Sequence, residues 1–428
     1  MGVTGSQENK EKKPVALIVG GGYAGVQCAK SLDETGLFFV VLIDRKSYFL
    51  HNVATLRATV EENFSQQILI PYDRLLTNGC VVKAEVLSIS HDGVQVHGRR
   101  EPIHFDYLVI ATGSSYAFPG KIAETEISKA ISIYNTIREK VTASKNILII
   151  GGGPVGIELA GEIATDFPDK EITLVHSQST LLYPNVFKQK LYGSIQDQLE
   201  KLNVKIILND RIQLPSDQQM NYIEGKNTYV TQTSKTSVTA DLTFVCTGAH
   251  VNNRSLLNGS LKSKLNAQTG RLIVNNYLQV DGFENIFAVG DISDKETKLA
   301  YIAGEQGTYL GKLIPLLHKK KSTPKEYKVN PNAALLVSIG RNGGAGQLPF
   351  GGITIGSFLM KQIKSKELFT SRYRSMMNYG SDIQAETKSP YLNKLDSVQS
   401  ILSLSEDDAR NLLAGLPTKE LEPGQDFS

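Results

Sequence analysis

The chain has 428 residues, 41% of them hydrophobic and 21% charged, which fits a globular protein of two or three domains. No apolar run approaches the roughly 18 residues of a membrane-spanning helix, and residues 1–13 lack the apolar core of a secretory signal. The three cysteines, Cys28, Cys80 and Cys246, lie far apart without metal-ligand spacing, so we expect buried thiols and no metal. The formal net charge of +3 is uneven: acidic residues outnumber basic ones by five after Gly380, which leaves +8 on the rest.

A glycine fingerprint follows the first apolar run, residues 15–19. It reads Gly20, Gly21, Gly22, Tyr23, Ala24 and Gly25. In G-x-G-x-x-G after a strand, the first glycine allows a tight turn, the second lets a pyrophosphate approach, and the third lets the helix pack on the strand. The next predicted strand, residues 38–43, ends at Asp44, where a carboxylate binds ribose hydroxyls.

A second fingerprint begins about 130 residues later, where residues 147–150 lead into Gly151, Gly153 and Gly156. Two such motifs predict two dinucleotides, and the simplest pair is FAD and NADH or NADPH. The strand at 172–175 ends at His176 instead of a carboxylate, so we expect this site to accept NADPH, with His176 near its phosphate. The alternative is a solvated loop histidine.

The two units share a longer plan. Each continues to a buried strand that closes in Thr-Gly, at Thr112-Gly113 and at Thr247-Gly248. A third signature, Gly290-Asp291, places an aspartate at a helix start, where it can accept from a ribityl hydroxyl or serve as a plain N-cap. The repeated order predicts an internal duplication of the dinucleotide-binding unit.

These signatures predict an α/β protein with two nested Rossmann-like domains, for FAD and NAD(P)H, and a small α+β C-terminal domain. The C-terminal domain has strand patterns at 334–339 and 350–355, then a helix over 357–369 that carries Lys364. We expect the acidic tail to be flexible or weakly docked, with a short helix through Leu413. The expected boundaries are a leader at 1–13, FAD domain at 14–118 and 250–330, NAD(P)H domain at 119–249, C-terminal domain at 331–377 and tail at 378–428.

Several local strings are more specific than the fingerprints. With the order of the signatures, they make residues 14–377 resemble the apoptosis-inducing-factor-like branch of the FAD-dependent pyridine nucleotide oxidoreductases. The last fifty residues depart from that pattern. The strings are residues 51–58 (HNVATLRA), 111–114 (ATGS), 118–120 (FPG), 156–158 (GIE), 173–177 (TLVHS), 338–342 (SIGRN) and 364–369 (KSKELF).

The resemblance implies an FAD-dependent NAD(P)H:quinone oxidoreductase whose acceptors are ubiquinone and vitamin K-type quinones. Its hydroquinone products trap lipid radicals and so suppress ferroptosis. It also admits 6-hydroxy-FAD as the flavin. The implied site residues are Glu158 at the nicotinamide–flavin junction, Lys364 at the flavin, Phe369 on the quinone path, and Asn52, Arg57 and Val81 as further cofactor contacts. Without the resemblance, Glu158 could simply be an acidic residue that stabilises the positive end of the helix dipole, and Lys364 could be an ordinary surface lysine.

A quinone with a long isoprenoid tail lies in lipid, so we expect peripheral attachment to the cytoplasmic face of a lipid droplet, plasma membrane or mitochondrial outer membrane. Gly2 fits the N-myristoylation pattern, and one acyl chain needs a second signal such as a basic surface. Residues 357–377 carry five basic side chains, with Phe358, Leu359, Met360, Ile363, Leu368 and Phe369 interleaved, and this pattern fits the role. Two alternatives are a reductase of a small iron–sulfur carrier and a flavin-switched signalling or nucleic-acid-binding protein. No aromatic–basic motif predicts specific nucleic acid binding.

Overall fold

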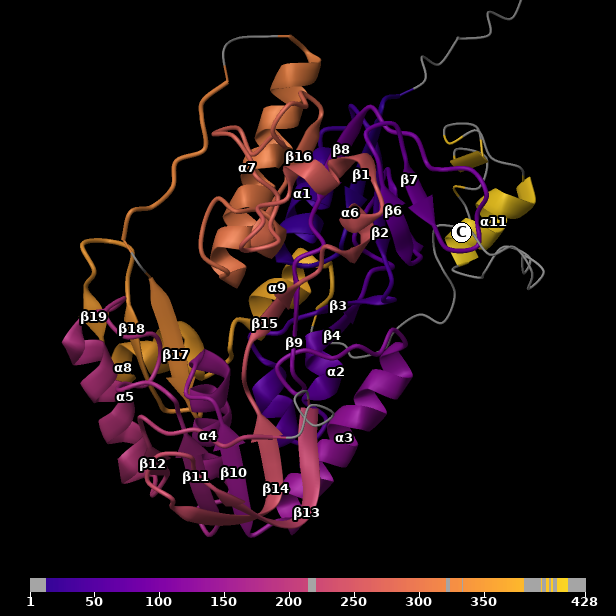
Figure 1. The fold of residues 1–428 in the computed structure, drawn as a ribbon. Helices are drawn as coiled ribbons and strands as arrows, with labels where there is room; N and C mark the ends of the chain where they lie inside the picture. The colour runs from indigo at the N-terminus through magenta and orange to yellow at the C-terminus, as the bar shows by residue number, and fades with distance from the viewer. Residues whose placement is uncertain are drawn as a thin grey trace, which may run out of the picture.

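The computed structural model describes residues 13–214, 221–320, 324–332 and 334–380, together with 394, 398–399, 402 and 406–414. Two five-stranded sheets form an upper and a lower unit in Figure 1, and a three-stranded sheet lies beside the lower one. This is the predicted α/β architecture with two Rossmann-like units and a small C-terminal domain.

The upper unit is built on a parallel sheet of order β16-β8-β1-β2-β5. All five residues of β1 are buried, as expected for a strand with both faces covered. Helix α1 (Tyr23–Asp33) packs against α7 (Ala300–His318) so closely that a Cβ on Gly307 would lie 2.4 Å from the Ala24 carbonyl oxygen. The strands are β1 (Val15–Val19), β2 (Phe39–Asp44), β5 (Cys80–Lys83), β8 (Tyr107–Ile110) and β16 (Ile286–Ala288).

The lower unit repeats the plan with the order β12-β11-β10-β14-β13, in which only β13 runs antiparallel to its neighbour. Its strands are β10 (Asn146–Ile150), β11 (Glu171–Val175), β12 (Lys205–Ile207), β13 (Asn221–Val230) and β14 (Ser237–Val245). Its helices are α3 (Ile127–Ala143), α4 (Pro154–Asp166) and α5 (Gln189–Lys201).

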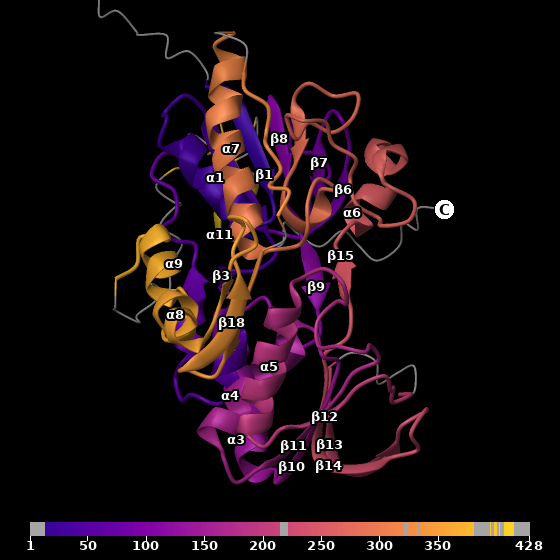
Figure 2. The ribbon, with the colours of Figure 1, turned by 90° about the vertical axis from the view of Figure 1, so that its left-hand side faces the viewer.

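Two short antiparallel strands connect the units. The chain leaves the upper unit through β9 (Ser114–Tyr116) and returns through β15 (Ala249–Val251), with Ala249 opposite Tyr116. Both strands run between the two sheets in Figures 1 and 2. The second dinucleotide unit is therefore inserted into the first. Five shorter elements belong to the core of the upper unit: β6 (Val86–Ile89), β7 (Val94–Val96), α6 (Arg254–Leu257), η3 (Ser260–Lys264) and η4 (Gly290–Ile292). Four others place buried side chains in the core of the lower unit: β3 (Tyr48–Leu50), η1 (Thr55–Thr59), α2 (Ser65–Ile68) and β4 (Leu69–Pro71).

The C-terminal domain packs its sheet, β17 (Leu335–Ile339), β18 (Gly343–Gln347) and β19 (Thr354–Ile355), against α4. A Cβ on Gly161 of α4 would lie 2.7 Å from the Ile339 Cα, so only glycine fits there. The helix predicted over 357–369 ends at Ser365. It consists of α8 (Ser357–Met360) and the π-helix η5 (Lys361–Ser365), and it breaks before α9 (Thr370–Met376), because Leu368 and Phe369 take left-handed φ values of 52° and 63°.

Part of the acidic C-terminal stretch, for which we expected a flexible or weakly docked tail with a short helix, is docked. Helix α11 (Glu406–Ala414) lies beside the upper sheet in Figure 1, where Val398, Ala409 and Leu413 are buried in the same core as β5. The Lys394 ammonium donates to the carbonyl oxygen of Thr77 at 2.7 Å. Ala409 and Leu413 are four residues apart and so lie on one face of α11, and this apolar face packs against β5, the edge strand of the upper sheet.

Candidate active site between two dinucleotide cradles

The first fingerprint forms a turn whose outer glycines are sterically required. Gly20 has φ +106°, and a Cβ there would lie 2.3 Å from the Ala111 carbonyl oxygen. A Cβ on Gly25 would lie 1.8 Å from the Gly20 carbonyl oxygen. A Cβ on the middle glycine, Gly22, would meet nothing within 4 Å. The open space at Gly22, at the start of α1, fits a pyrophosphate.

The second fingerprint repeats these contacts. Gly151 has φ +116°, with a hypothetical Cβ 2.4 Å from the Cys246 carbonyl oxygen, and a Cβ on Gly156 would lie 1.9 Å from the Gly151 carbonyl oxygen. The space at Gly153 is again open, at the start of α4. The residues present therefore fit two dinucleotides, one at each cradle.

Asp44 and His176 occupy equivalent places in the two units. The Gly21 N–H donates to the Asp44 carboxylate at 2.6 Å, and the Gly152 N–H donates to Nδ1 of His176 at 3.0 Å. Since Nδ1 accepts, Nε2 carries the proton and faces the Leu182 carbonyl oxygen at 3.3 Å. Burial lowers the pKa of His176, so its ring is neutral at pH 7. The first cradle thus carries a carboxylate where the second carries an uncharged imidazole.

The Thr-Gly turns close both cradles at the other side. Gly113 and Gly248 have φ values of 66° and 69°, and Thr112 and Thr247 precede them at matching positions. The Thr112 hydroxyl donates to the Asn252 carbonyl oxygen at 2.7 Å. Asn252 follows β15, so this bond fastens the returning chain to the first unit.

Asp291 lies beside a lysine that the sequence did not single out. The Ser114 hydroxyl donates to Asp291 Oδ2 at 2.5 Å, and the Lys121 ammonium donates to the Ser114 carbonyl oxygen at 2.5 Å. Lys121 Nζ is 3.9 Å from Asp291 Oδ2. Burial lowers the pKa of Lys121, and Asp291 opposes that shift. Gly290, with φ +73°, donates its N–H to the Gln306 side chain at 2.7 Å.

Glu158 and Lys364 form a buried ion pair although 206 residues separate them. The Lys364 ammonium donates to Glu158 Oε1 at 2.5 Å and to the Leu336 carbonyl oxygen at 2.7 Å. The same Oε1 accepts from the N–H and hydroxyl of Ser338, both at 3.1 Å. The residues are 8% and 7% exposed. Glu158 lies in the first turns of α4 and Lys364 in the π-helix, so the pair joins the second cradle to the C-terminal domain.

Arg57, which the resemblance implies as a cofactor contact, has a guanidinium that is held by protein groups. Its guanidinium is 1% exposed and binds both carboxylate oxygens of Glu162, at 2.8 and 3.1 Å. It also donates to the carbonyl oxygens of Ser365 and Lys366, at 2.7 and 2.9 Å. The buried carboxylate of Glu162 needs a cation, and this demand explains the orientation of Arg57.

The other expected cofactor and acceptor residues stay predictions. The carbonyl oxygen of Gly21 accepts from the Tyr72 hydroxyl at 2.6 Å. Tyr23 and Ala24 are buried in the first turn of α1, Asn52 is half-buried before η1, and Val81 lies on β5, opposite Leu42. Phe369 is half-buried at the break before α9. Gly2 lies outside the described residues.

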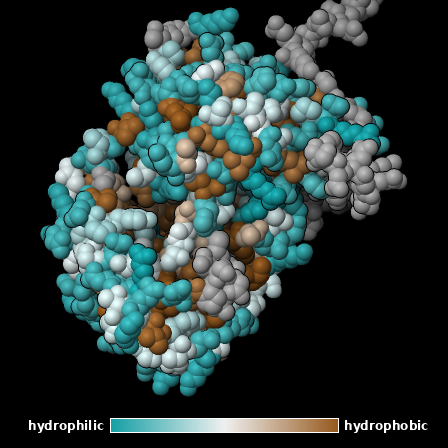
Figure 3. All heavy atoms as spheres, viewed as in Figure 1, coloured by the Kyte–Doolittle hydropathy of each residue, from teal (hydrophilic) through white to brown (hydrophobic). Residues whose placement is uncertain are grey.

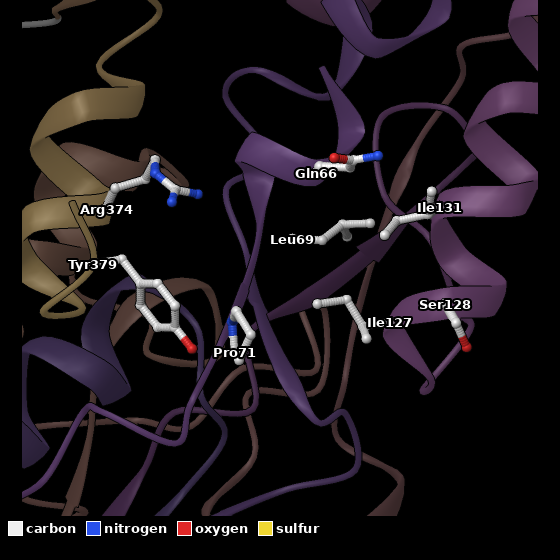
Figure 4. Close-up of a pocket in the computed structure, with 8 residues that line it drawn as sticks. All are labelled: Gln66, Leu69, Pro71, Ile127, Ser128, Ile131, Arg374 and Tyr379. Atoms are coloured by element: carbon white, nitrogen blue, oxygen red, sulfur yellow. The ribbon is translucent and has the colours of Figure 1, made fainter. Parts of the chain in front are cut away.

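A pocket of about 240 Å³ lies between α3, β4 and α9, away from both fingerprints. In Figure 4, Leu69, Pro71, Ile127 and Ile131 form its apolar wall, and Arg374 and Tyr379 face them from α9 and the residues after it. Gln66 and Ser128 complete the lining. Ligand sites usually span about 300–1,000 Å³, so this smaller pocket alone does not indicate a ligand.

The thiols are inert. All three cysteines are buried and unpaired, and burial raises the pKa of each to about 12. The described residues contain no cluster of histidine, cysteine or carboxylate side chains that could hold a metal ion. Among those same residues, no helix has the length and hydropathy to cross a bilayer.

Comparisons with known proteins agree with this geometry. A family model described as pyridine nucleotide-disulphide oxidoreductase matches residues 13–307. Apoptosis-inducing factor homolog B of Dictyostelium discoideum is 37% identical over 385 residues, covering 86% of this chain and 97% of that protein. Ferroptosis suppressor protein 1 is 38% identical over 375 residues in Xenopus tropicalis and 34% identical over 383 residues in Homo sapiens, with the same coverages.

Solved structures share the fold at low sequence identity. The sulfide:quinone oxidoreductase of Aquifex aeolicus superposes with a TM-score of 0.67 at 16% identity, covering 92% of this chain and 96% of that one. NDH2 of Plasmodium falciparum, in complex with NADH, gives 0.64 at 14% identity, covering 87% and 100%. The chain therefore belongs to the pyridine nucleotide-disulphide oxidoreductase family, among the ferroptosis suppressor protein 1 and apoptosis-inducing factor homologs, and is an FAD-dependent NAD(P)H oxidoreductase.

Proposed function

We propose that the chain is an NAD(P)H:quinone oxidoreductase that works at a membrane surface. The observation that carries the proposal is the buried Glu158–Lys364 pair, which holds a fixed ammonium where the C-terminal domain meets the second cradle. An oriented cation in a site shielded from water stabilises negative charge that develops on a substrate oxygen. A quinone acquires such charge on both oxygens as it is reduced.

When bound, FAD would supply the redox chemistry that carries two electrons from the nicotinamide to the second substrate. The chain positions the partners: Gly22 and Gly153 leave room for the two pyrophosphates. An ammonium has three N–H donors, and Glu158 and Leu336 accept two of those on Lys364. We assign the third to an oxygen of the quinone.

The acceptor is a diffusible molecule in this proposal, because the thiols offer no relay. Disulfide reductases pass electrons through a reactive cysteine pair, whereas the cysteines here are separate, buried and protonated at neutral pH. Ubiquinone or a vitamin K-type quinone fits this role, and Phe369 would line its path. Its hydroquinone would trap lipid radicals and so suppress ferroptosis, the process that the relatives named ferroptosis suppressor protein 1 are said to suppress.

An apolar rim on one side of the molecule supports the membrane part of the proposal. We define this apolar rim as Tyr183, Val186, Phe350, Ile353, Phe358, Leu359 and Ile363, which are 41–78% exposed. The Lys188 ammonium ties its two loops together through the Gly351 carbonyl oxygen at 3.2 Å. Two residues of the stretch expected to face the membrane, Met360 and Leu368, are buried instead. The residues of the rim come from the stretch before α5, the turn between β18 and β19, α8 and η5, and α5, β18 and α8 lie side by side in Figures 1 and 2.

Figure 3 shows apolar side chains in a hollow between the upper and lower units as well as scattered over the face. Exposed aromatic side chains with lysines beside them favour the interface of a bilayer. Exposed Lys188 and Lys366 fit anionic lipid. Together with an acyl chain on Gly2, the rim would give the two signals that stable peripheral attachment to a cytoplasmic membrane face needs.

Stopped-flow spectroscopy tests the reaction. The FAD-loaded protein is bleached with NADPH or NADH and then mixed with a soluble ubiquinone analogue, a ferredoxin or air. Fast reoxidation by the quinone alone is the expected result. Preference for the ferredoxin would establish a carrier reductase, and a reduced flavin that stays inert would indicate a signalling protein; either result refutes the proposal. The Glu158→Ala variant should reoxidise slowly, and full turnover would remove Glu158 from the site.

Flotation with liposomes tests the membrane surface. The Phe358→Ser variant should bind anionic liposomes more weakly than the wild type, because burying one phenylalanine contributes about 1.5–3 kcal/mol. Leu87→Ser is a matched control, since Leu87 is also exposed but lies on β6 of the upper unit. Equal binding of the two variants would exclude the apolar rim. A Gly2→Ala variant that remains wholly on membranes would exclude the acyl chain as the main attachment.

A further inference from the structure

The turn between Lys364 and α9 has an unfavourable backbone. Leu368 and Phe369 both take left-handed φ values, 52° and 63°, although neither is a glycine. Such a conformation persists only where the surrounding structure holds it, and it is concentrated at functional sites. The π-helical turn that carries Lys364 immediately precedes it, and π-turns have the same tendency. Something outside the segment must therefore stabilise this backbone.

A chain of three hydrogen bonds reaches this turn from the first unit. The Val53 N–H donates to the Tyr23 hydroxyl oxygen at 3.2 Å, and that hydroxyl is 2.9 Å from Nδ1 of His51. Nε2 of His51 is 2.7 Å from the Leu368 carbonyl oxygen. A carbonyl oxygen only accepts, so Nε2 carries the proton, Nδ1 is the acceptor, and the Tyr23 hydroxyl must donate to it. The direction of every bond in the chain is fixed.

Packing holds the imidazole in that orientation. The His51 side chain is 0% exposed, and its ring centroid lies 4.6 Å from that of Tyr373, in α9. Arg57, six residues further along, donates to the carbonyl oxygens of Ser365 and Lys366. One short segment of the first unit therefore binds three carbonyl oxygens that lie between Lys364 and Phe369.

We propose that His51 is a positioning residue for the acceptor side of the site: its Nε2–H holds the left-handed turn that sets where Phe369 and Lys364 lie. The inference rests on the proposed function for the identity of the acceptor, but its structural part stands separately. Tyr23 directly follows Gly22 of the first cradle, so the same hydrogen-bond chain connects the flavin phosphate site to the quinone side.

Two variants of His51 test the role in catalysis. His51→Phe keeps an aromatic ring against Tyr373 but leaves the Leu368 carbonyl and the Tyr23 hydroxyl without their partner. His51→Gln keeps an N–H donor for Leu368. At equal FAD content, His51→Phe should raise the KM for the soluble ubiquinone analogue by at least about tenfold. The rate of flavin bleaching by NADH should stay within about twofold of wild type. His51→Gln should return the KM for the quinone most of the way to the wild-type value. Equal losses in both half-reactions, or no loss in either, would overturn the proposal.

A fluorescence measurement gives a readout that does not depend on turnover. The chain has no tryptophan, so Phe369→Trp places a single reporter on the turn. In that background, His51→Phe should increase acrylamide quenching of the tryptophan, and His51→Gln should return it to the starting value. Unchanged quenching in the His51→Phe protein would refute the positioning role even if the kinetics change. If wild-type flavin is not reoxidised by quinone, the proposed function fails, and the quenching result still decides the role of His51.

Discussion

Removing one charge of the Glu158–Lys364 pair should destabilise the protein more than removing both. At the 2.5 Å separation of Nζ and Oε1, the attraction is about 7 kcal/mol with an effective dielectric constant of about 20. Desolvation of two charges offsets most of this, whereas a single change leaves one buried charge unpaired and costs about 3–5 kcal/mol. Glu158→Gln and Lys364→Met keep the side-chain volumes. We expect each to lower the free energy of unfolding by about that amount, and the pair to couple by about 2–4 kcal/mol.

Urea unfolding of the FAD-loaded wild type, both single variants and the double variant gives the coupling energy directly. The control is the pair Arg138–Glu62, which is 3.5 Å apart with side chains 31% and 71% exposed. A surface pair of this kind should couple by less than about 1 kcal/mol. A coupling below about 0.5 kcal/mol for Glu158 and Lys364 would mean that the two charges act independently, and the reasoning would be refuted.

Three further predictions concern the cradles and pH. Gly22→Ala should leave a folded protein with little bound flavin, because a Cβ there meets no protein atom but fills the space for the phosphate. Gly20→Ala should not fold normally, because its Cβ would lie 2.3 Å from the Ala111 carbonyl oxygen. Flavin absorbance measures the first effect and circular dichroism the second. Burial lowers the pKa of His51 from 6.5 to about 4, so between these pH values the unfolded chain binds a proton that the folded chain does not. The free energy of unfolding, measured by urea titration, should therefore fall by up to about 3 kcal/mol from pH 6.5 to pH 4. This contribution should be absent in His51→Gln. His176→Asp should raise the KM for NADPH by about tenfold or more and leave that for NADH nearly unchanged, because a carboxylate repels the 2′-phosphate; equal KM changes would contradict this.

The local part of the fold could be predicted because its causes are local. Gly20 and Gly151 adopt positive φ values beside a neighbouring strand, and only glycine tolerates that geometry, so the sequence shows both turns directly. The strand and helix patterns around them also lie within short windows. The resemblance indicated Glu158 and Lys364 as separate candidates, but nothing in the sequence predicted that they form one ion pair.

The errors in the prediction have long-range causes. We expected one helix over 357–369, but Arg57 and His51 bind carbonyl oxygens at 365, 366 and 368 and so stabilise a different backbone. Those partners lie about 310 residues away in the chain, where no local pattern can reveal them. The partners of Arg57 were not predicted for the same reason, since its sequence neighbours do not show the carboxylate of Glu162. Lys121 was missed because only the fold brings it beside Asp291.

The two carboxylates of α4 link all three parts of the site. Glu158 and Glu162 are four residues apart and so lie on one face of the helix. Glu158 binds Lys364 of the C-terminal domain, and Glu162 binds Arg57 of the first unit, which in turn holds the carbonyl oxygens just after Lys364. The N-cap of this helix is Gly153, in the second cradle. A shift of this helix on nucleotide binding would therefore move the ammonium of Lys364 and its supporting turn together, so that the two halves of the reaction share one rigid element.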